Sequence, residues 1–228
     1  MRMIETKNLT KEFKNGDIVT PVLKGIDFKA GEGEWIAVMG RSGAGKSTFL
    51  YQMSLLDDPT EGEVIIDKHD THAMSAHEKM RFRLVTFGFV FQDYALLPEL
   101  TALENVALPL LMQGFSKSHS YKDATVALER AELAHRIDNL PSQLSGGEQQ
   151  RVSIVRAVAH NPKILFADEP TANLDNESAG RIMEMFTDLH KRGQTIIMVT
   201  HEEQYAKLAG RIIHLDDGRI TSSETRAR

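Results

Sequence analysis

The chain has 228 residues, of which 41% are hydrophobic and 26% are charged, with 16 glycines and 7 prolines. These proportions are typical of folded globular proteins and exclude a collagen-like, low-complexity or disordered chain. The length suits one large domain or two small ones. Acidic residues number 32 against 27 lysines and arginines, a net charge of -5, so we expect no nucleic acid as the main partner.

The sequence contains no cysteine. This excludes disulfides, thiolate nucleophiles and cysteine-ligated zinc, and it is compatible with a reducing compartment. Residues 1–13 lack the apolar core of a signal peptide. The longest apolar runs, such as Val106–Met112, are far shorter than the roughly 20 residues that cross a bilayer. We therefore expect any role at a membrane to be peripheral.

The first predicted elements are two strands that form an antiparallel β element. Apolar and polar residues alternate over Met3–Leu9 and again over Val22–Phe28. Between them, Asn15-Gly16 supplies the positive φ angle that a tight hairpin turn requires. An antiparallel subdomain is therefore expected to open the fold.

The following elements are predicted from shorter patterns. The apolar run Trp35–Met39 predicts a strand, and residues 46–53 are compatible with a helix. Residues 62–67 predict a further strand. Ser75 and Glu78 have the spacing of a capping box, which predicts the start of a short helix.

A mostly helical lobe is predicted from about Thr101 to Gln150. Its apolar residues recur at helical spacing, for example at Ala124, Leu128 and Ala131. Proline removes a backbone donor and ends or kinks helices. We expect the prolines of this region to break its helices; they are Pro98, Pro109 and Pro141.

The last part of the chain continues the alternation of strands and helices. The apolar run Ile164–Ala167 predicts a buried strand, and the helix that follows is expected to end near Gly193. Residues 195–200 and 211–215 predict the last strands. Such alternation implies an α/β fold with a parallel sheet that is covered on both faces. No repeat or linker divides the sequence, which predicts a single domain over residues 1–228.

The segment 40–47, with the sequence GRSGAGKS, matches the phosphate-binding pattern G-x-x-x-x-G-K-[ST]. Small residues let successive backbone N–H groups surround a phosphate at the positive end of a helix. Lys46 is expected to meet the β- and γ-phosphates, and Ser47 to ligate Mg²⁺. Kinases, GTPases and motor or transport ATPases share this loop, so it does not choose among them. The predicted nucleotide-binding residues here are Gly40, Ser42, Gly43, Ala44, Gly45, Lys46, Ser47 and Thr48.

A second glycine-containing segment is LSGGEQQR at residues 144–151. In one interpretation, Ser145 and Glu148 only form a capping box, and the glycines relieve crowding at a helix start. In the other, the exposed N–H groups of the same capped helix bind the γ-phosphate of a nucleotide held by another molecule. The two interpretations are compatible.

Together, GRSGAGKS and LSGGEQQR resemble the ATP-binding cassette family, the motor subunits of ABC transporters. Four more family motifs follow in order, namely FVFQDY with Gln92, ILFADE with Asp168 and Glu169, ANLD with Asp175, and MVTHE with His201. The resemblance covers nearly the whole chain. It implies a P-loop NTPase core with a mostly parallel sheet, an amino-terminal antiparallel β subdomain and a helical subdomain.

The implied core lobe spans about residues 1–95 and 160–228, and the implied helical signature lobe spans about 96–159. ATP and Mg²⁺ are the implied substrate and cofactor. A carboxylate at the end of an apolar strand is costly unless it serves a cation, and the family uses the position of Asp168 to hold Mg²⁺.

The resemblance also implies roles in hydrolysis. It makes Glu169 the general base that polarises the attacking water, and Gln92 a contact of Mg²⁺ and water. His201 matches the histidine that contacts the γ-phosphate. The implied catalytic residues are therefore Glu169, His201 and Gln92, and the implied metal-binding residues are Ser47, Gln92 and Asp168.

Phe13 lies where relatives stack an aromatic ring on adenine, and the alternative is that it is a core residue. The resemblance makes LSGGEQQR the family signature and ANLD its D-loop, whose residues are expected to bind the nucleotide of a partner molecule; they are Ser145, Gly146, Gly147, Glu148 and Asp175. The sequence departs from the family pattern at Arg41, where many relatives have proline, and at Ala172, where glycine or serine is common.

The family pairs two cassettes head to tail, with each ATP between the loop 40–47 of one and the signature of the other. The resemblance therefore implies an ATP-dependent homodimer that acts on a separate membrane permease, from the cytoplasmic side of the inner membrane. The loop containing Tyr94, Leu96, Leu97 and Leu100 is either the docking region of that permease or buried core.

Local strings such as LLPELTALENVALPL most resemble the subfamily of lipoprotein-release, macrolide-efflux and FtsE-like cell-division ATPases. Lipoprotein release is the expected function, with export of macrolides or peptides and an FtsE-like role as alternatives. A soluble cassette ATPase of DNA repair or translation is less expected, because this chain lacks a coiled-coil insertion or a second cassette. A P-loop kinase or GTPase would not explain LSGGEQQR.

Overall fold

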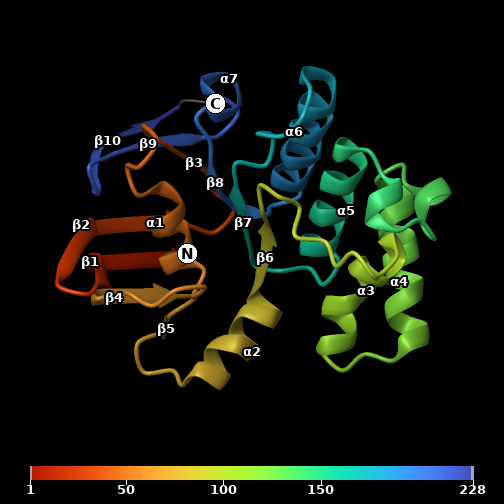
Figure 1. Ribbon diagram of the computed structural model, residues 1–228, viewed down its shortest axis with the longest axis horizontal. Helices are drawn as coiled ribbons and strands as arrows, with labels where there is room; N and C mark the ends of the chain where they lie inside the picture. The colour runs from red at the N-terminus through yellow and green to blue at the C-terminus, as the bar shows by residue number, and fades with distance from the viewer. Residues whose placement is uncertain (1, 227–228) are drawn as a thin grey trace. The chain divides into compact units, whose positions relative to one another are not determined.

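The computed structural model of the chain describes residues 2–226, which form two compact units (Figure 1). The first unit contains the residues up to Arg81 and those from Leu189 onward, and the second contains Phe82–Asp188. Both units combine helices with strands, and parallel strand pairs occur in each, as expected for the α/β class. The implied partition into a core lobe and a helical signature lobe has other boundaries and stays a prediction.

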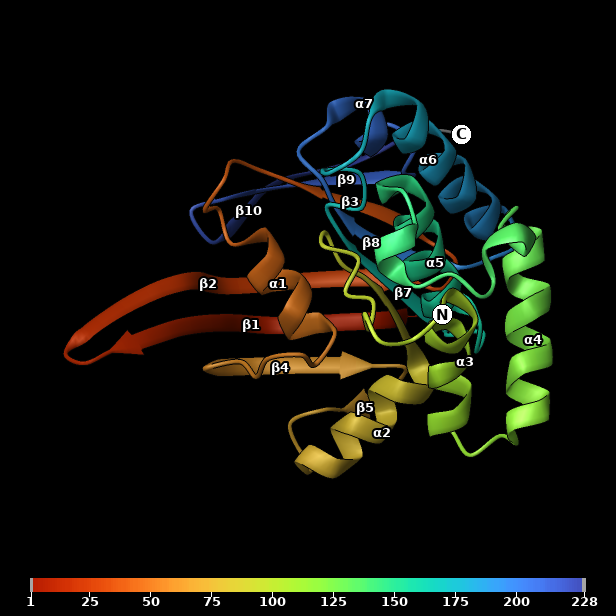
Figure 2. The same ribbon diagram turned by 45° about the vertical axis from the view of Figure 1, so that its right-hand side comes forward.

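An antiparallel sheet with the strand order β2-β1-β4-β5 belongs to the first unit. β1 and β2 form a long hairpin (Figure 2), and Gly16 in its turn has a φ of 59°, so the predicted turn is confirmed. The strands of this sheet are β1 (Arg2–Asn15), β2 (Ile18–Gly31), β4 (Glu61–Ile66) and β5 (His69–Asp70).

The hairpin is longer than the alternation of apolar residues predicts. Residues 10–15 and 18–21 belong to β1 and β2, but most of their side chains are exposed on both faces. Alternation arises only where one face of a sheet is buried. Periodicity therefore identifies the inner part of this hairpin and misses the outer part.

A second set of strands in the first unit has the order β10-β9-β3-β8. β3 pairs in parallel with β8 and β9, and β10 pairs with β9 in the antiparallel sense. Every residue of β3 and of β8 is buried, and both strands lie where the sequence predicts them. The bounds are β3 (Trp35–Met39), β8 (Thr195–Val199), β9 (Arg211–Asp216) and β10 (Arg219–Thr225).

Two helices of the first unit come next after strands of this set along the chain. α1 (Lys46–Met53) follows β3, and the short α7 (Glu203–Ala206) follows β8. Along the chain, α2 (Ala76–Thr86) and α6 (Asn176–Lys191) run from one unit into the other. α2 begins with the predicted capping box, in which the backbone N–H of Ser75 donates to Glu78 Oε2 at 2.7 Å.

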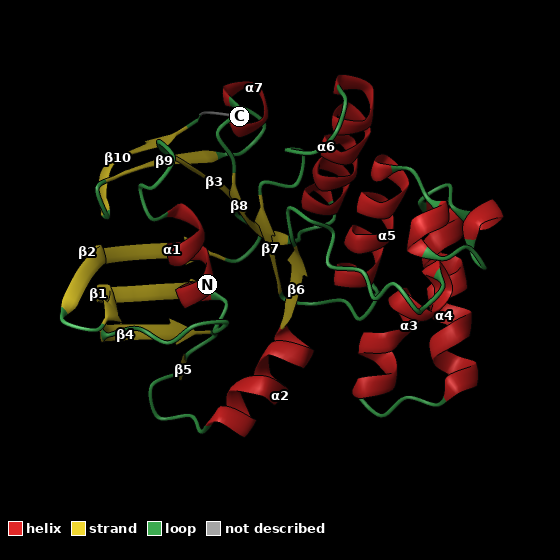
Figure 3. Ribbon diagram, in the orientation of Figure 1, coloured by secondary structure: helices red, strands yellow, loops and turns green. Residues whose placement is uncertain are grey.

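The second unit contains one pair of parallel strands and most of the helices (Figure 3). α3, α4 and α5 pack on one another, and Ala124, Leu128 and Ala131 are buried among them, so the prediction of mostly helical structure over residues 101–150 is confirmed. The elements are β6 (Phe87–Val90), α3 (Ala102–Met112), α4 (Lys117–Arg130), η1 (Ala134–Arg136), η2 (Pro141–Gln143), α5 (Gly146–Val158) and β7 (Ile164–Asp168).

The prediction that Pro109 breaks a helix is wrong, because Pro109 lies inside α3. Proline removes one backbone donor, and this loss falls near the end of the helix, where few further hydrogen bonds depend on it. Leu110 in the last turn is buried with 4% exposure, which favours continuing the helix. Pro98 and Pro141 lie outside the α-helices, as predicted.

Candidate functional site

The segment 40–47 forms a tight loop between β3 and α1 of the first unit. Gly40, Gly43 and Gly45 have φ angles of 155°, 79° and 97°, a region that residues with a side chain rarely adopt. A Cβ atom at Gly40 would lie 2.1 Å from the carbonyl oxygen of Leu215. The backbone of this loop therefore requires glycine, and loops of this kind can turn successive backbone N–H groups toward an anion.

The first turn of α1 carries neither a side-chain cap nor an acidic residue. Lys46 folds back over the loop, and its Nζ donates to the carbonyl oxygens of Gly40 at 3.0 Å and Arg41 at 3.2 Å. Ser47 and Thr48 lie in the same turn. An uncapped helix N-terminus next to a lysine ammonium attracts an anion such as phosphate.

In the first unit, His201 lies at the same end of the parallel strands as the phosphate loop. β3 and β8 are parallel neighbours, and the backbone N–H of Thr200 donates to the carbonyl of Val38 at 3.2 Å. Exposed His201 follows Thr200, and Gly40 directly follows β3. Because the carboxyl ends of parallel strands meet at one edge, the predicted loop and the predicted histidine lie at the same edge.

The second unit gathers three other predicted residues at the carboxyl ends of β6 and β7, which are parallel neighbours. Asp168 ends β7 and is only 5% exposed, and Glu169 follows it. Gln92 lies just beyond β6, and its carbonyl oxygen accepts a hydrogen bond from Asn173 Nδ2 at 3.0 Å. The buried carboxylate of Asp168 suits a residue that serves a cation.

Ser145 caps the N-terminus of α5, as its motif predicts. Its Oγ accepts from the backbone N–H of Glu148 at 3.3 Å, and its own N–H donates to Glu148 Oε2 at 2.8 Å. Both bonds of a capping box are therefore present. The side chain of Ser145 is exposed at the start of the helix.

The two signature glycines allow neighbouring segments to approach α5. A Cβ atom at Gly146 would lie 2.9 Å from the hydroxyl oxygen of Tyr94, and one at Gly147 would lie 2.9 Å from Ser178 Oγ. Ser178 in turn donates its backbone N–H to Asp175 Oδ1 at 2.9 Å, so Asp175 binds the first turn of α6. The loop that carries Tyr94 and the first turn of α6 thus lie close to the two glycines.

Glu148 is held in its ionised form by its neighbours. Burial opposes its charge, but the backbone N–H of Ser145 and the guanidinium of Arg136 outweigh it and lower the pKa of Glu148 from 4.5 to about 2. Arg136 Nε donates to Glu148 Oε1 at 2.8 Å. The carboxylate therefore stabilises the start of α5 at neutral pH.

We expect the stability that Glu148 adds to depend on pH. A carboxyl group with a lowered pKa stabilises the fold above its usual pKa of 4.5, and that contribution fades as the pH falls towards 2. Urea unfolding of the wild type and of Glu148→Gln at several pH values measures the contribution of Glu148 to the free energy of unfolding. The difference between their unfolding free energies should persist above about pH 4.5 and shrink below it. A difference that does not change with pH would contradict this assignment.

Phe13 lies on β1 with 48% of its surface exposed, so the alternative that it is a core residue is wrong. Lys11 Nζ lies 5.1 Å from the centroid of its ring and donates to Asp57 Oδ1 at 2.7 Å. An exposed aromatic ring offers a face on which a nucleobase can stack. Sequence reasoning did not identify the contact of Lys11 with this ring.

The predicted docking loop has mixed burial. Leu97 is 42% exposed, whereas Tyr94, Leu96 and Leu100 are half-buried. Arg156 of α5 holds this loop, because its guanidinium donates to the carbonyl oxygens of Tyr94 at 2.9 Å and of Ala95. Burial lowers the pKa of Arg156 to about 10, so its charge remains at neutral pH.

The residues predicted to bind Mg²⁺ have side chains of the chemical types that suit this ion. Ser47, Gln92 and Asp168 offer a hydroxyl, an amide and a carboxylate oxygen, the ligand types that this ion prefers. Residues 2–226 contain no cluster of three or more His, Asp or Glu side chains that could form a complete metal cage. A site that binds Mg²⁺ together with nucleotide phosphates needs no such cage.

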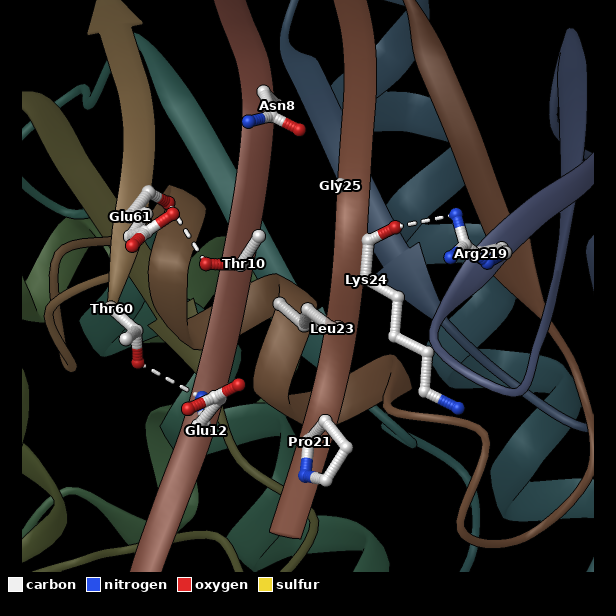
Figure 4. Close-up of a pocket in the computed structure, with 10 residues that line it drawn as sticks. All are labelled: Asn8, Thr10, Glu12, Pro21, Leu23, Lys24, Gly25, Thr60, Glu61 and Arg219. Atoms are coloured by element: carbon white, nitrogen blue, oxygen red, sulfur yellow. Dashed lines mark hydrogen bonds between the residues drawn. The ribbon is translucent and has the colours of Figure 1, made fainter. Parts of the chain in front are cut away.

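A separate groove of about 450 Å³ lies along the antiparallel sheet of the first unit (Figure 4). Glu12 and Glu61 line one side, and Lys24 and Arg219 line the other. Arg219 donates to the carbonyl of Lys24 at 2.8 Å. None of the predicted site residues lines this groove, so it is distinct from the phosphate loop.

Comparisons with known proteins identify the family of this chain. The sequence profile of the ABC transporter family matches residues 23–172. The chain belongs to the ABC transporter family. Its fold is similar to that of the cassette MJ0796 of Methanocaldococcus jannaschii, in a dimeric structure of a post-hydrolysis state bound to ADP and Pi. The TM-score is 0.92 and the sequence identity is 42%, and the match covers 99% of this chain and 100% of that one. The chain is therefore a P-loop ABC ATPase and the ATP-binding subunit of an ABC transporter, in which ATP hydrolysis is coupled to transport.

Two groups of relatives differ in what they transport. The cassette is 45% identical to the lipoprotein-releasing system ATP-binding protein LolD of Geobacter metallireducens, over 96% of this chain and 98% of LolD. It is 42% identical to the macrolide export ATP-binding/permease protein MacB of Brucella melitensis, over 98% of this chain but only 35% of MacB. Both names fall in the subfamily that the sequence resembles, and they leave the transported molecule open.

Proposed function

We propose that this ABC ATPase binds two ATP molecules between two copies of itself, arranged head to tail, and drives a separate membrane permease. The observation that carries the nucleotide part is the phosphate loop, in which positive-φ glycines and Lys46 lie at the uncapped start of α1. The dimeric relative bound to ADP and Pi supports the same arrangement. A twofold pair of identical cassettes gives two equivalent sites.

Each predicted residue then has a defined task. Lys46 neutralises the β- and γ-phosphates, and the backbone N–H groups of the loop bind their oxygens. Glu169 accepts the proton of the attacking water, and His201 contacts the γ-phosphate. When bound, Mg²⁺ neutralises charge on the phosphates, and Ser47, Gln92 and Asp168 supply its protein ligands.

The partner's signature completes each site in this proposal. Ser145, Gly146 and Gly147 present the start of α5 to the γ-phosphate, while Glu148 and Asp175 hold the helix starts beside them. ATP therefore favours the closed dimer, and hydrolysis removes the contacts that favour closure. The permease converts this change into transport.

We place the cassette at the cytoplasmic face of the inner membrane. In the part of the chain that the structure describes, none of the helices has the length and apolar character to cross a bilayer. The similarity to LolD supports a permease of the lipoprotein-release type, and the similarity to MacB supports macrolide export as the second candidate.

A pull-down tests this assignment. Tagged Glu169→Gln, with ATP and Mg²⁺, is incubated with detergent-solubilised membranes, and retained proteins are identified by mass spectrometry. We expect a permease with a few spanning helices and a large extracytoplasmic domain, and a lipoprotein-binding domain would support lipoprotein release. Retention of a macrolide-export component would favour the second candidate. A stable ATP-dependent dimer without a membrane protein would contradict the transporter assignment.

The adenine contact gives a further prediction. Stacking on an aromatic ring contributes about 1–3 kcal/mol per base, so Phe13→Ala should weaken ATP binding about 5- to 150-fold. Phe13→Tyr keeps the stacking face and should bind like the wild type. Titration with a fluorescent ATP analogue measures both constants. Equal affinity of Phe13→Ala and wild type would show that the base does not stack on this ring.

A further inference from the structure

Gln150 connects two backbone segments of the predicted catalytic site within the second unit. Its side chain is fully buried on α5, with 0% exposure. Its Nε2 donates to the carbonyl oxygen of Pro170 at 2.7 Å and lies 3.5 Å from that of Phe91. Pro170 directly follows Glu169, and Phe91 directly precedes Gln92. One amide therefore reaches the segments that carry two of the predicted catalytic side chains.

The backbone at Glu169 has an unfavourable conformation. Its φ is 46°, in the left-handed region that residues other than glycine rarely adopt. A following proline makes extended conformations still more favourable for the residue before it. Such strain persists at functional sites only where the surrounding structure holds it. The turn is closed on one side by the hydrogen bond from Ala172 N to Glu169 O at 3.1 Å, and on the other by Gln150.

The amide of Gln150 is costly for folding. Its Oε1 is buried and has no hydrogen-bond partner in the described part of the chain. A buried acceptor without a partner destabilises the folded state, whereas an apolar side chain of the same length does not have this cost. Packing alone therefore does not explain glutamine at this position, and the bond to Pro170 offers another reason.

We propose that Gln150 is a positioning residue for ATP hydrolysis, whose amide holds the turn at Glu169 and Pro170 in the strained conformation that the general base requires. This inference rests on the proposed function, because it needs Glu169 to polarise the attacking water. Gln150 contacts the backbone of Pro170 and is not part of the phosphate loop. Its loss therefore lowers turnover and leaves ATP binding unchanged.

The test is Gln150→Met, which keeps the length of the side chain and removes the amide. We expect kcat to fall about 10- to 100-fold, because misplacing a catalytic group by about 1 Å costs up to about 100-fold. The KM for ATP should stay within twofold. The melting temperature should be equal to or higher than that of the wild type, since the unpaired Oε1 is gone. Loss of activity without loss of stability is the result that a merely structural role does not give.

The chain offers a matched control in Gln52. This glutamine is also fully buried in a helix, also has an unpartnered Oε1, and donates from Nε2 to Asp57 Oδ2 at 3.0 Å. Gln52→Met should keep the kcat of the wild type within about twofold. An equal loss of kcat in both variants would overturn the proposal, because it would reflect the removal of any buried amide.

Two further variants separate the possible failures. Gln150→Leu also removes the amide donor and leaves an apolar side chain, so it serves as the test if Gln150→Met does not fold. Glu169→Gln is assayed in parallel. If Glu169→Gln stops turnover while both Gln150 variants keep wild-type kcat, only the positioning role is overturned. If Glu169→Gln keeps turnover, the proposed general base and the inference fail together.

Discussion

Replacing Glu169 by glutamine should stop ATP hydrolysis and leave ATP binding intact. A positioned general base contributes about 10²–10⁴-fold to the rate, so kcat should fall by at least about 100-fold. Glu169 follows β7 and is not part of the phosphate loop, so we expect the dissociation constant of ATP to stay within about twofold. Phosphate release under saturating ATP measures the first quantity, and titration with a fluorescent ATP analogue measures the second.

Glu184 provides the control for this substitution. It is an exposed glutamate on α6 of the same unit, so Glu184→Gln removes a carboxylate without touching the predicted site. Its turnover should equal that of the wild type. A Glu169→Gln enzyme that hydrolyses ATP at more than a tenth of the wild-type rate would show that another group accepts the proton.

Replacing Lys46 by alanine should weaken the binding of ATP itself. The ammonium is held by the carbonyl oxygens of Gly40 and Arg41 and is therefore already placed over the loop. A charge-assisted hydrogen bond contributes about 1.5–3 kcal/mol, so the dissociation constant of ATP should rise about 10- to 150-fold. Isothermal titration with ATP and Mg²⁺ measures this change.

The specificity of this effect is tested with Lys122→Ala. Lys122 is exposed on α4, so its removal changes the net charge equally without altering the phosphate loop. Affinity should be unchanged in this variant. Equal weakening by both substitutions would mean that Lys46 acts only through the total charge of the protein, which would contradict its place at the phosphates.

The phosphate loop and the signature were predictable because their geometry depends on local residues. Positive φ at Gly40 and Gly45 permits the loop, and the capping box of Ser145 and Glu148 forms within a single turn of helix. Such features are determined by a few consecutive residues. The sequence therefore placed them on a loop and at a helix start, and the structure agrees.

Features that depend on distant contacts were not predictable in the same way. β6 follows α2 without any turn residue, so its few residues do not stand out as a strand. In the sequence, Gln150 is a polar residue on a predicted helix. Only its hydrogen bond to Pro170 indicates that it positions the catalytic segment. The one available signal is its helical spacing to Gly147 and Ile154, which are buried on the same helix.

The most direct test of the proposed mechanism is sedimentation velocity of Glu169→Gln with and without ATP. We expect a monomer without nucleotide and, with ATP, a dimer that contains one ATP per chain. A Ser145→Arg substitution in the same background places a bulky cation at the start of α5 and should abolish the dimer while leaving ATP binding unchanged. A chain that binds ATP and stays monomeric, or a Ser145→Arg variant that still dimerises, would contradict a site shared between two cassettes.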